Sequence, residues 1–463
     1  MKKTIMVMLI ISLCTGVMLT GCGKGEEPVE LKPLSPEEPA PAGIPEGEVT
    51  PAAAHEETSG GEAALQPVAE ETPDDAEGTD IGESADTDMT FDNIRASVEA
   101  FNLKLYKEYE GKGNLFYSPC SIVSALALTD LAARGETKEE MEKALNITDF
   151  ESFKQEMKAF NERKQSEKAY LKTANGLFID KNLKLSDSYK EDFEDPAKEY
   201  FKGEFRSVDF KDTETVKQEI SRWVSDATEE MIPDYKTAAD AETVADILNA
   251  VYFYGEWQRK FSGSDTRKDL FRTAEGDKEV DMMYMESEYF RYVSDADGVK
   301  AVALPYDDGS YEMDIFMYAD PEKKETEGIF DIISGEDILS RLDNADETEL
   351  STLALPKFKM DLELEGLKEK LGSMGLERAF SGDADFSILA DSLQISDICH
   401  RAVVEVDEEG SRAAAVTEVV MKLTSVMPME EVKEDFIADK PFVFMIRDRE
   451  SGVILFTGRV NEL

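Results

Sequence analysis

The sequence has few of the residues that most often carry enzyme and metal chemistry. Its 463 residues include two histidines, His55 and His400, and four cysteines. A Ser-His-Asp hydrolase would have to use His400, and no GxSxG motif accompanies that residue. No CxxC pair or Cys/His cluster suggests a metal site. We therefore expect a protein that is not an enzyme and that holds neither a metal nor an organic cofactor.

Positive charge is also scarce. Lysine and arginine number 51 against 100 aspartates and glutamates, which leaves a formal net charge of -49 at pH 7. A nucleic-acid-binding face needs clustered cations to meet the phosphates, so this charge excludes a binder of that kind. It also disfavours docking on anionic lipid by charge alone. We therefore expect no nucleic-acid partner.

Cysteine is too rare for a disulfide framework. Cys14 and Cys22 lie near the N-terminus, so Cys120 and Cys399 remain for the folded part. Both lie in apolar runs, where a small thiol is most often buried and unpaired. We therefore expect two buried free thiols.

The N-terminus carries a targeting signal. Two lysines precede an apolar run, which predicts a secretory signal peptide over residues 1–21 rather than a stable membrane span. The run ends in Leu19, Thr20, Gly21 and Cys22, and this tetrapeptide resembles the bacterial lipobox. The resemblance implies cleavage before Cys22 and a lipid on its sulfur, which would anchor the protein to the outer face of a bacterial membrane. The alternative is an ordinary signal peptide that happens to end beside a cysteine.

Residues 22–90 differ in composition from the rest of the chain. From residue 23 to residue 90 there is no aromatic residue, whereas nine of the 17 prolines and 19 acidic residues fall there. Such a segment cannot bury enough apolar surface to offset the entropy of ordering it. We therefore predict a disordered, acidic, Pro-rich tether that holds a folded domain away from the membrane.

Residues 91–463 have the pattern of one large α+β domain. Helical signals dominate the first part: apolar residues at helical spacing over 94–105, a helix start at Ser118 and Pro119, and a capping box of Thr137 and Glu140. A further amphipathic helix is predicted over 220–232. Strand-like runs follow at 171–179, 244–254 and 350–358, and a closing hairpin is predicted over 441–460.

Residues 408–428, EEGSRAAAVTEVVMKLTSVMP, have two faces if they form a strand. After Gly410, side-chain alternation would put every charged residue on one face and small or apolar residues on the other. An Ala-rich run is also a good helix former. This stretch alone therefore leaves a strand, a permanent half-buried strand and a surface helix open.

Several motifs in one order resemble the serpin family. FIADKPFVFMI at 436–446 resembles the C-terminal signature of that family, and further motifs match in family order: NLFYSPCSIVSALAL (114–128), LNAVYFYGEW (248–257), LPKFKMD (355–361) and SDICHRAVVEVDEEG (396–410). The resemblance covers residues 91–463. It implies a serpin fold with N-terminal helices, a large central mixed β-sheet, further sheets and an exposed reactive-centre loop.

The resemblance also implies a mechanism. In serpins, a target serine protease cuts the loop and becomes bound as an acyl-enzyme. The front half of the loop then inserts into the central sheet as a new strand, and the protease is dragged away and distorted before it can deacylate. The native state is therefore kinetically trapped. The implied partner is a serine protease in a covalent complex, and the implied protein is a monomer.

The loop residues carry over by position. The family spacing of fourteen residues past the hinge glycine puts the scissile bond between Thr424 and Ser425, and the small Thr424 suits an elastase-like protease. A shifted register would instead use Leu423 or Met421, which suit chymotrypsin-like proteases. The implied hinge comprises Glu408, Glu409, Gly410, Ser411, Arg412, Ala413, Ala414, Ala415, Val416 and Thr417.

Two hinge residues depart from the family pattern. Arg412 stands where inhibitory serpins usually have an acid, and Val416 is larger than the usual small residue. Both fall on the face expected to meet solvent, so we expect insertion to tolerate them.

Two more sets of residues match serpin positions around the central sheet. Trp257 and Glu408 match the breach at its upper end, where insertion starts. The shutter beneath the sheet is matched by Ser118, Ser121, Asn249 and His400. Ordinary core packing would explain either set equally well.

Two other functions remain open. The protein could be a serpin that does not inhibit and whose loop is a plain cleavable substrate. It could also be a lipid-anchored solute-binding protein, which would show two α/β lobes with parallel strands.

Overall fold

The structure is a computed structural model that describes residues 90–411 and 434–463, apart from Lys112, Ala238, 296–297, Glu336, 396–397 and Cys399. The signal peptide, the tether and most of the loop therefore lie outside the described residues. So do Cys22, Thr424, Ser425 and the hinge from Arg412 to Thr417. The proposed boundaries of the tether remain predictions.

Helices dominate the first part of the described chain, as predicted. α1 (Asp92–Glu108) buries the apolar residues whose spacing predicted it, namely Ile94, Val98, Phe101 and Leu105. α2 (Pro119–Asp130) begins where expected, because Ser118 Oγ accepts the N–H of Ser121 and proline occupies the first turn. The others are α3 (Gly135–Ala144), α4 (Phe150–Glu162), η1 (Lys190–Glu194), α5 (Asp195–Phe201), α6 (Thr213–Ala227), α7 (Ile329–Gly335), α8 (Ile338–Asp343), α9 (Leu367–Ser373) and η2 (Arg378–Phe380).

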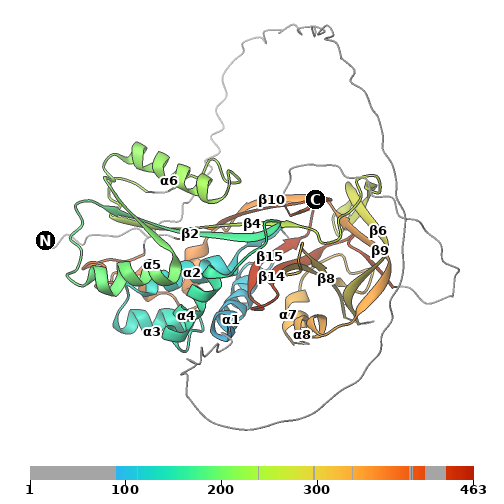
Figure 1. The fold of residues 1–463 in the computed structure, drawn as a ribbon, viewed down its shortest axis with the longest axis horizontal. Coiled ribbons are helices and arrows are strands. Elements are labelled where there is room, and N and C mark those ends of the chain that lie inside the picture. Colours follow the sequence, from blue (N-terminus) through green and yellow to red (C-terminus); the bar gives the residue numbers. More distant parts are fainter. Residues whose placement is uncertain are drawn as a thin grey trace, which may run out of the picture. The chain divides into compact units, whose positions relative to one another are not determined.

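The first sheet has six strands in the order β10-β11-β12-β4-β2-β3. Helix α2 packs against β4 from one side, whereas α6 covers β2 and β4 from the other (Figure 1). The strands are β2 (Ala169–Asp180), β3 (Gly203–Val208), β4 (Ala245–Glu256), β10 (Phe358–Glu363), β11 (Arg401–Val406) and β12 (Gly410–Ser411).

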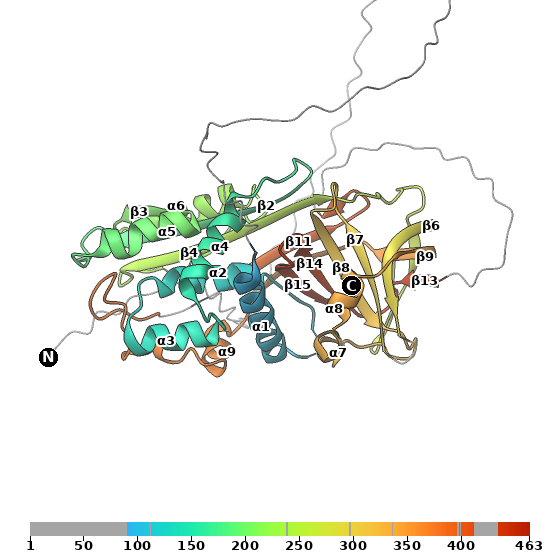
Figure 2. The same cartoon turned by 60° about the horizontal axis from the view of Figure 1, so that its bottom comes forward.

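The second sheet has nine strands, in the order β1-β15-β14-β8-β7-β6-β9-β13 with β5 paired to β6. Figure 2 places β13 beside β9 at its edge, and the two strands pair in parallel. The strands are β1 (Leu115–Tyr117), β5 (Arg267–Thr273), β6 (Gly276–Ser294), β7 (Val299–Pro305), β8 (Tyr311–Tyr318), β9 (Glu347–Pro356), β13 (Glu434–Ile437), β14 (Phe442–Asp448) and β15 (Ile454–Val460).

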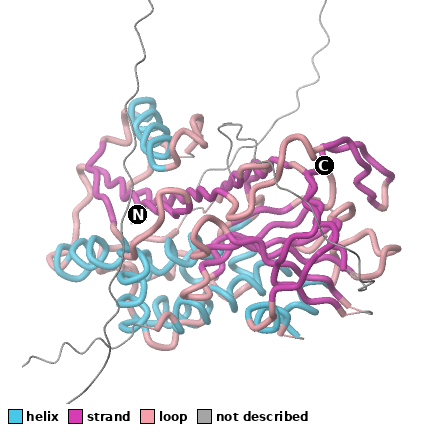
Figure 3. Tube along the Cα trace, turned by 45° about the vertical axis from the view of Figure 1, so that its right-hand side comes forward, coloured by secondary structure: helices cyan, strands magenta, loops and turns pink. Residues whose placement is uncertain are grey.

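The arrangement confirms the α+β class. Most helices of the folded domain gather toward one end (Figure 3), and strands β6–β9 and β13 of the second sheet lie toward the other (Figure 2). The predicted closing hairpin is β14 and β15, which pair antiparallel. Within the described residues, no helix is both long and apolar enough to cross a membrane.

The predicted capping box of α3 was wrong. The helix begins at Gly135, three residues earlier than the box requires, and no side chain caps it. Thr137 Oγ1 instead accepts the N–H of Asp385 at 2.9 Å, and Glu140 accepts the N–H of Arg378 at 2.6 Å. Both side chains thus satisfy the backbone of a distant segment, which no local pattern reveals.

Two other boundaries differ from the predictions. The helix expected over 220–232 ends at Ala227, because Glu229 and Glu230 adopt positive φ angles of 49° and 64° that a right-handed helix does not allow. The run 350–358 is the end of β9 and the start of β10, which belong to different sheets. A continuous apolar run cannot show that the chain changes sheets at Lys357.

Candidate functional site

The described start of the hinge, residues 408–411, belongs to a β-hairpin whose turn spans residues 407–410. Strand β11 ends at Val406, and Ser411 of β12 pairs with it antiparallel. Asp407 N–H donates to Gly410 O at 3.1 Å. The Asp407 carboxylate accepts the N–H groups of Glu409 and Gly410 at 2.9 and 3.3 Å. An aspartate that bonds to backbone two and three residues ahead is a common way to fix a tight turn.

The two residues after the turn lie in the six-stranded sheet. Gly410 pairs with Glu256 and Ser411 with Gly255, so β12 separates β4 from β11. Over the described residues, no register pair joins β4 directly to β11. Strands β4 and β11 therefore stand apart, and a strand that continued β12 would run between them.

Gly410 has no room for a side chain. A Cβ at this position would lie 1.9 Å from the carbonyl oxygen of Gly255 and 2.8 Å from the Cα of Glu256. Its φ of 156° is also one that other residues rarely adopt. Glycine is therefore required for β12 to approach β4 this closely.

The side chains of Trp257 and Tyr306 contact the turn and the first residues of β12. Trp257 Nε1 donates to Asp407 O at 2.9 Å, and its ring stacks on Tyr306 at 4.6 Å. The Tyr306 hydroxyl shares a 2.7 Å hydrogen bond with the Ser411 hydroxyl. Both hydroxyls are buried, and burial raises the pKa of Tyr306, so the phenol stays neutral. Ser411 thus points into the core, on the face expected from the alternation.

Glu408 is held by an ion pair and a hydroxyl. Its carboxylate lies 2.5 Å from Lys357 Nζ and accepts a 2.8 Å hydrogen bond from Thr266. Burial alone would raise the pKa of Glu408, but these hydrogen bonds lower it overall. Trp257 and Glu408, which the sequence placed in one region, do lie together. Lys357, Thr266 and Tyr306 were missed, although Lys357 stands inside a quoted motif.

The four residues matched to the shutter form one hydrogen-bonded cluster beneath the sheet. Ser118 N–H donates to His400 Nε2 at 2.9 Å, and the Ser118 hydroxyl donates to Leu455 O at 2.6 Å. The Ser121 hydroxyl donates to Asn249 Oδ1. Asn175 of β2, which was not predicted, accepts from Asn249 Nδ2 at 2.8 Å. The cluster thus ties α2 to β2, β4 and the residue before β11.

His400 is neutral in this cluster. It is buried, and burial lowers its pKa to about 4. Its Nε2 accepts a hydrogen bond from backbone, which a doubly protonated ring cannot do. Protonation of His400 would therefore break the bond to α2.

A narrow cavity continues the gap below Ser411. It has a volume of about 20 Å³, which is enough for roughly one water molecule. Phe253 and Tyr252 of β4 line one side, Val404 and neighbouring β11 residues line the other, and Met231 lies nearby. This cavity is thus mostly apolar and has room for little more than a methyl group.

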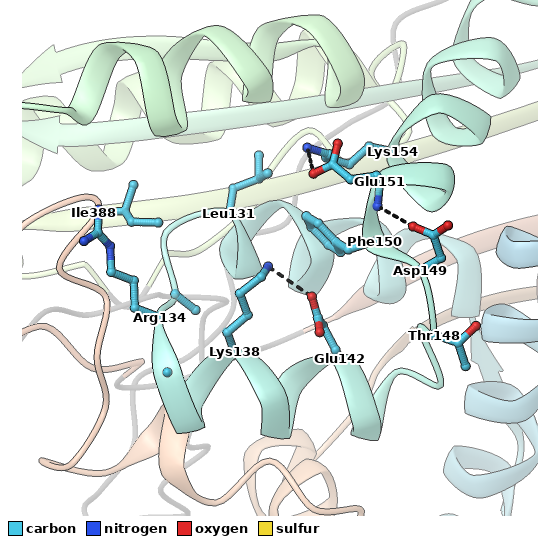
Figure 4. A pocket seen from close by; sticks show the side chains of 12 residues that line it. Leu131, Arg134, Lys138, Glu142, Thr148, Asp149, Phe150, Glu151, Lys154 and Ile388 are labelled. Atoms are coloured by element: carbon cyan, nitrogen blue, oxygen red, sulfur yellow. Dashed lines mark hydrogen bonds and ion pairs between the residues drawn. The ribbon is translucent and has the colours of Figure 1, made fainter.

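A larger cavity, of about 860 Å³, lies away from the hinge between α2, α3 and α4 (Figure 4). Its three cations are each within reach of an acid: Lys138 of Glu142, Lys154 of Glu151, and Arg134 of Asp192. These ion pairs neutralise its wall, and none of its lining residues belongs to the hinge or the cluster.

Cys120 is a buried free thiol, as expected. Burial raises its pKa to about 12, so it stays protonated and unreactive at neutral pH. Cys399, the other cysteine of this expectation, lies outside the described residues.

A family model described as Serpin (serine protease inhibitor) matches residues 96–463. The chain belongs to the serpin family. The leukocyte elastase inhibitor of Bos taurus is 35% identical over 383 residues, covering 80% of this chain and 98% of that protein. An uncharacterized serpin-like protein of Thermococcus kodakarensis is 34% identical over 373 residues, covering 79% and 84%.

Solved serpins share the fold. Tengpin, a thermophilic serpin in the native state, matches with a TM-score of 0.70 at 28% identity, over 84% of this chain and 96% of that chain. Serpin48 of Tenebrio molitor matches with a TM-score of 0.67 at 28% identity, over 82% and 100%. These matches confirm the family and the fold that the motifs indicated. The roles assigned to the individual serpin residues stay predictions.

Replacing His400 tests its influence on this serpin's stability. Its folded pKa of about 4 lies below the ordinary 6.5, so the unfolded chain takes up the proton first as pH falls. The free energy of unfolding should therefore decrease by up to about 3 kcal/mol between about pH 7 and about pH 4 because of this group. His400→Gln should remove that decrease in urea unfolding measured across this range.

The contribution of His400 is the difference in unfolding free energy between wild type and His400→Gln at each pH, because other buried groups titrate in the same range. Burial raises the pKa of Asp130 and Glu312 to about 7, so these groups change stability with the opposite sign over an overlapping range. Parallel stability curves for wild type and His400→Gln would contradict the assignment.

Proposed function

We propose that this serpin is a suicide-substrate inhibitor of serine proteases that traps its target as an acyl-enzyme. Membership of a family of serine protease inhibitors supports protease inhibition in general. The observation that carries the mechanism is the placement of β12 between β4 and β11. An inserting strand could continue from Ser411 without any change in the turn that joins β12 to β11.

Insertion would be favourable because the gap offers both hydrogen bonds and apolar contacts. A strand between β4 and β11 would form backbone ladders on both sides. Its inward side chains would enter the cavity lined by Phe253 and Val404. Small side chains such as those of Ala413 and Ala415 fit a cavity of that volume, whereas bulky ones would force the strands apart.

Continuing the register assigns neighbours to the loop residues. Ser411 pairs with Val406 and Gly255, so the same ladder would put Ala413 opposite Val404 and Phe253. Thr417 would arrive between His400 and Asn249, at the level of the polar cluster. On the outer face, Arg412 would lie opposite Glu405 and Tyr254. The departure from the family pattern at Arg412 would then place a cation beside an acid.

We further propose that the target is elastase-like. Thr424 is small and uncharged, and relatives named leukocyte elastase inhibitor are among the similar proteins. Cleavage after Leu423 or Met421 would instead favour a chymotrypsin-like target. The N-terminal motif supports export with the signal peptide 1–21, lipidation at Cys22 and anchoring to the outer face of a bacterial membrane. We also propose that the protein is a monomer.

Mixing the protein with an elastase-type serine protease tests the proposed function. We expect a covalent complex that survives denaturing electrophoresis, because the acyl bond would be trapped before hydrolysis. A protease whose catalytic serine is replaced by alanine is the control and should give no complex. Cleavage near Thr424 with full survival of protease activity would instead support the cleavable-substrate alternative.

Cleavage of the loop should also stabilise the protein. About ten new backbone hydrogen bonds at about 1 kcal/mol each would raise the melting temperature of a domain of this size by roughly 10–15 °C. Calorimetry before and after limited proteolysis measures this shift. An unchanged melting temperature would show that the loop does not insert.

Arg412→Glu tests the proposed register. The substitution would set two carboxylates opposite each other in the inserted strand. It should lower the melting temperature of the cleaved form by about 1–2 °C, while the uncleaved form changes little. The same substitution in a Glu405→Gln background should have a smaller effect, because the opposing charge is gone. Equal effects in both backgrounds would exclude the Arg412–Glu405 pairing.

A further inference from the structure

The hinge turn is held by the short segment 257–261 that follows β4. Trp257 donates from its backbone to Glu409 O at 2.8 Å and from its indole to Asp407 O at 2.9 Å. Phe261 N–H donates to Glu408 O at 3.1 Å. Backbone and core groups therefore fix the carbonyls of the turn, and its carboxylates need separate partners.

The turn concentrates negative charge. Asp407, Glu408 and Glu409 are consecutive, and Glu256 pairs with the next residue, Gly410. Four carboxylates thus converge in a chain that already carries a net charge of -49. Neighbouring carboxylates repel one another, so cations that pair with them stabilise the closed turn.

Lys260 lies between two of these acids. Its Nζ is 2.6 Å from Glu409 Oε2 and 2.9 Å from Glu256 Oε2. Tyr254 supports the arrangement by donating to Glu256 Oε1 at 3.0 Å. One ammonium thereby joins the end of β4 to the turn, across the same ladder that places Gly410 in the sheet.

We infer that Lys260 is a positioning residue for loop insertion: it holds the turn at residues 407–410 in the inserted geometry before the loop is cut. This inference rests on the proposed trapping mechanism, in which insertion must outrun deacylation. With the turn already formed, insertion starts at the next residue and the hinge backbone needs no further ordering. Lys260 therefore raises the fraction of cleaved protein that traps its protease.

If Lys260 only stabilised the fold, replacing it would lower the melting temperature of the uncleaved protein. The Lys260 side chain is 42% exposed, and ion pairs this exposed contribute little to global stability. Loss of Lys260 should then leave the melting temperature of the uncleaved protein nearly unchanged. Two other quantities should change instead: the rate of amide exchange in the turn at residues 407–410, and the fraction of cleaved serpin that traps a protease.

The experiment compares full-length wild type, Lys260→Met, Lys260→Arg and the control Lys158→Met. Lys158 forms a similar ion pair with Glu199 at 2.8 Å, on α4 and α5 rather than at the hinge. Deuterium uptake by a peptide that covers β11 and the turn reports whether the turn opens. The moles of serpin consumed per mole of elastase-type protease inhibited report the partition.

We expect Lys260→Met to speed exchange in the turn by about fivefold and to raise the serpin consumed per protease by a similar factor. Lys260→Arg should retain both values, and Lys158→Met should match wild type. Unchanged exchange and unchanged consumption in Lys260→Met would overturn the inference, as would equal changes in Lys158→Met.

Failure of the proposed function would look different. If wild type forms no covalent complex with the protease, trapping itself is wrong. The exchange measurement still decides whether Lys260 holds the turn, because it needs no protease.

Discussion

The pairing of Gly410 and Ser411 with two strands at once is the constraint on which the rest of this serpin depends. It requires a glycine, because the carbonyl of Gly255 occupies the space where a Cβ would lie. It requires that β4 and β11 stand apart, because two residues of a third strand lie between them. It also requires a closed turn at residues 407–410, since the chain must reverse direction within that length. Proteolysis would act on a sheet that already contains the first residues of its extra strand.

The polar cluster of Ser118, Ser121, Asn175, Asn249 and His400 stabilises the uncleaved sheet, yet its hydrogen bonds would have to change if a strand inserted there. Its hydrogen bonds join α2 to the strands on both sides of the gap, and buried polar groups are costly unless they are paired. The same bonds must be rearranged if a strand passes at that level. His400 can take part only while it is neutral, so acidity weakens the contact that holds α2 under the sheet. If the loop inserts as proposed, the stability of the uncleaved form and the ease of insertion would depend on the same few side chains.

Charge is distributed unevenly around the hinge. The chain is strongly acidic overall, yet Lys357 and Lys260 each bond to a different acid of the turn. Local pairing rather than net charge therefore decides the conformation of this segment. The large cavity near α3 follows the same rule, since its two lysines are each paired with an acid of their own helix. Net charge argues against a basic nucleic-acid-binding face but carries no information on these sites.

The sequence by itself determined the α+β class, the serpin family, the buried face of α1, the start of α2 and the final hairpin. These features depend on local spacing, on a capping serine or on motifs that are contiguous in the chain. Only the tertiary structure decided that Thr137 and Glu140 bond to a distant segment, that β9 and β10 belong to different sheets, and that Asn175 joins the cluster. It also decided the partners of the hinge. Lys260 and Glu409 are 149 residues apart, and Tyr306 and Ser411 are 105 apart. No periodicity spans such separations, because these contacts arise only when the whole sheet is assembled.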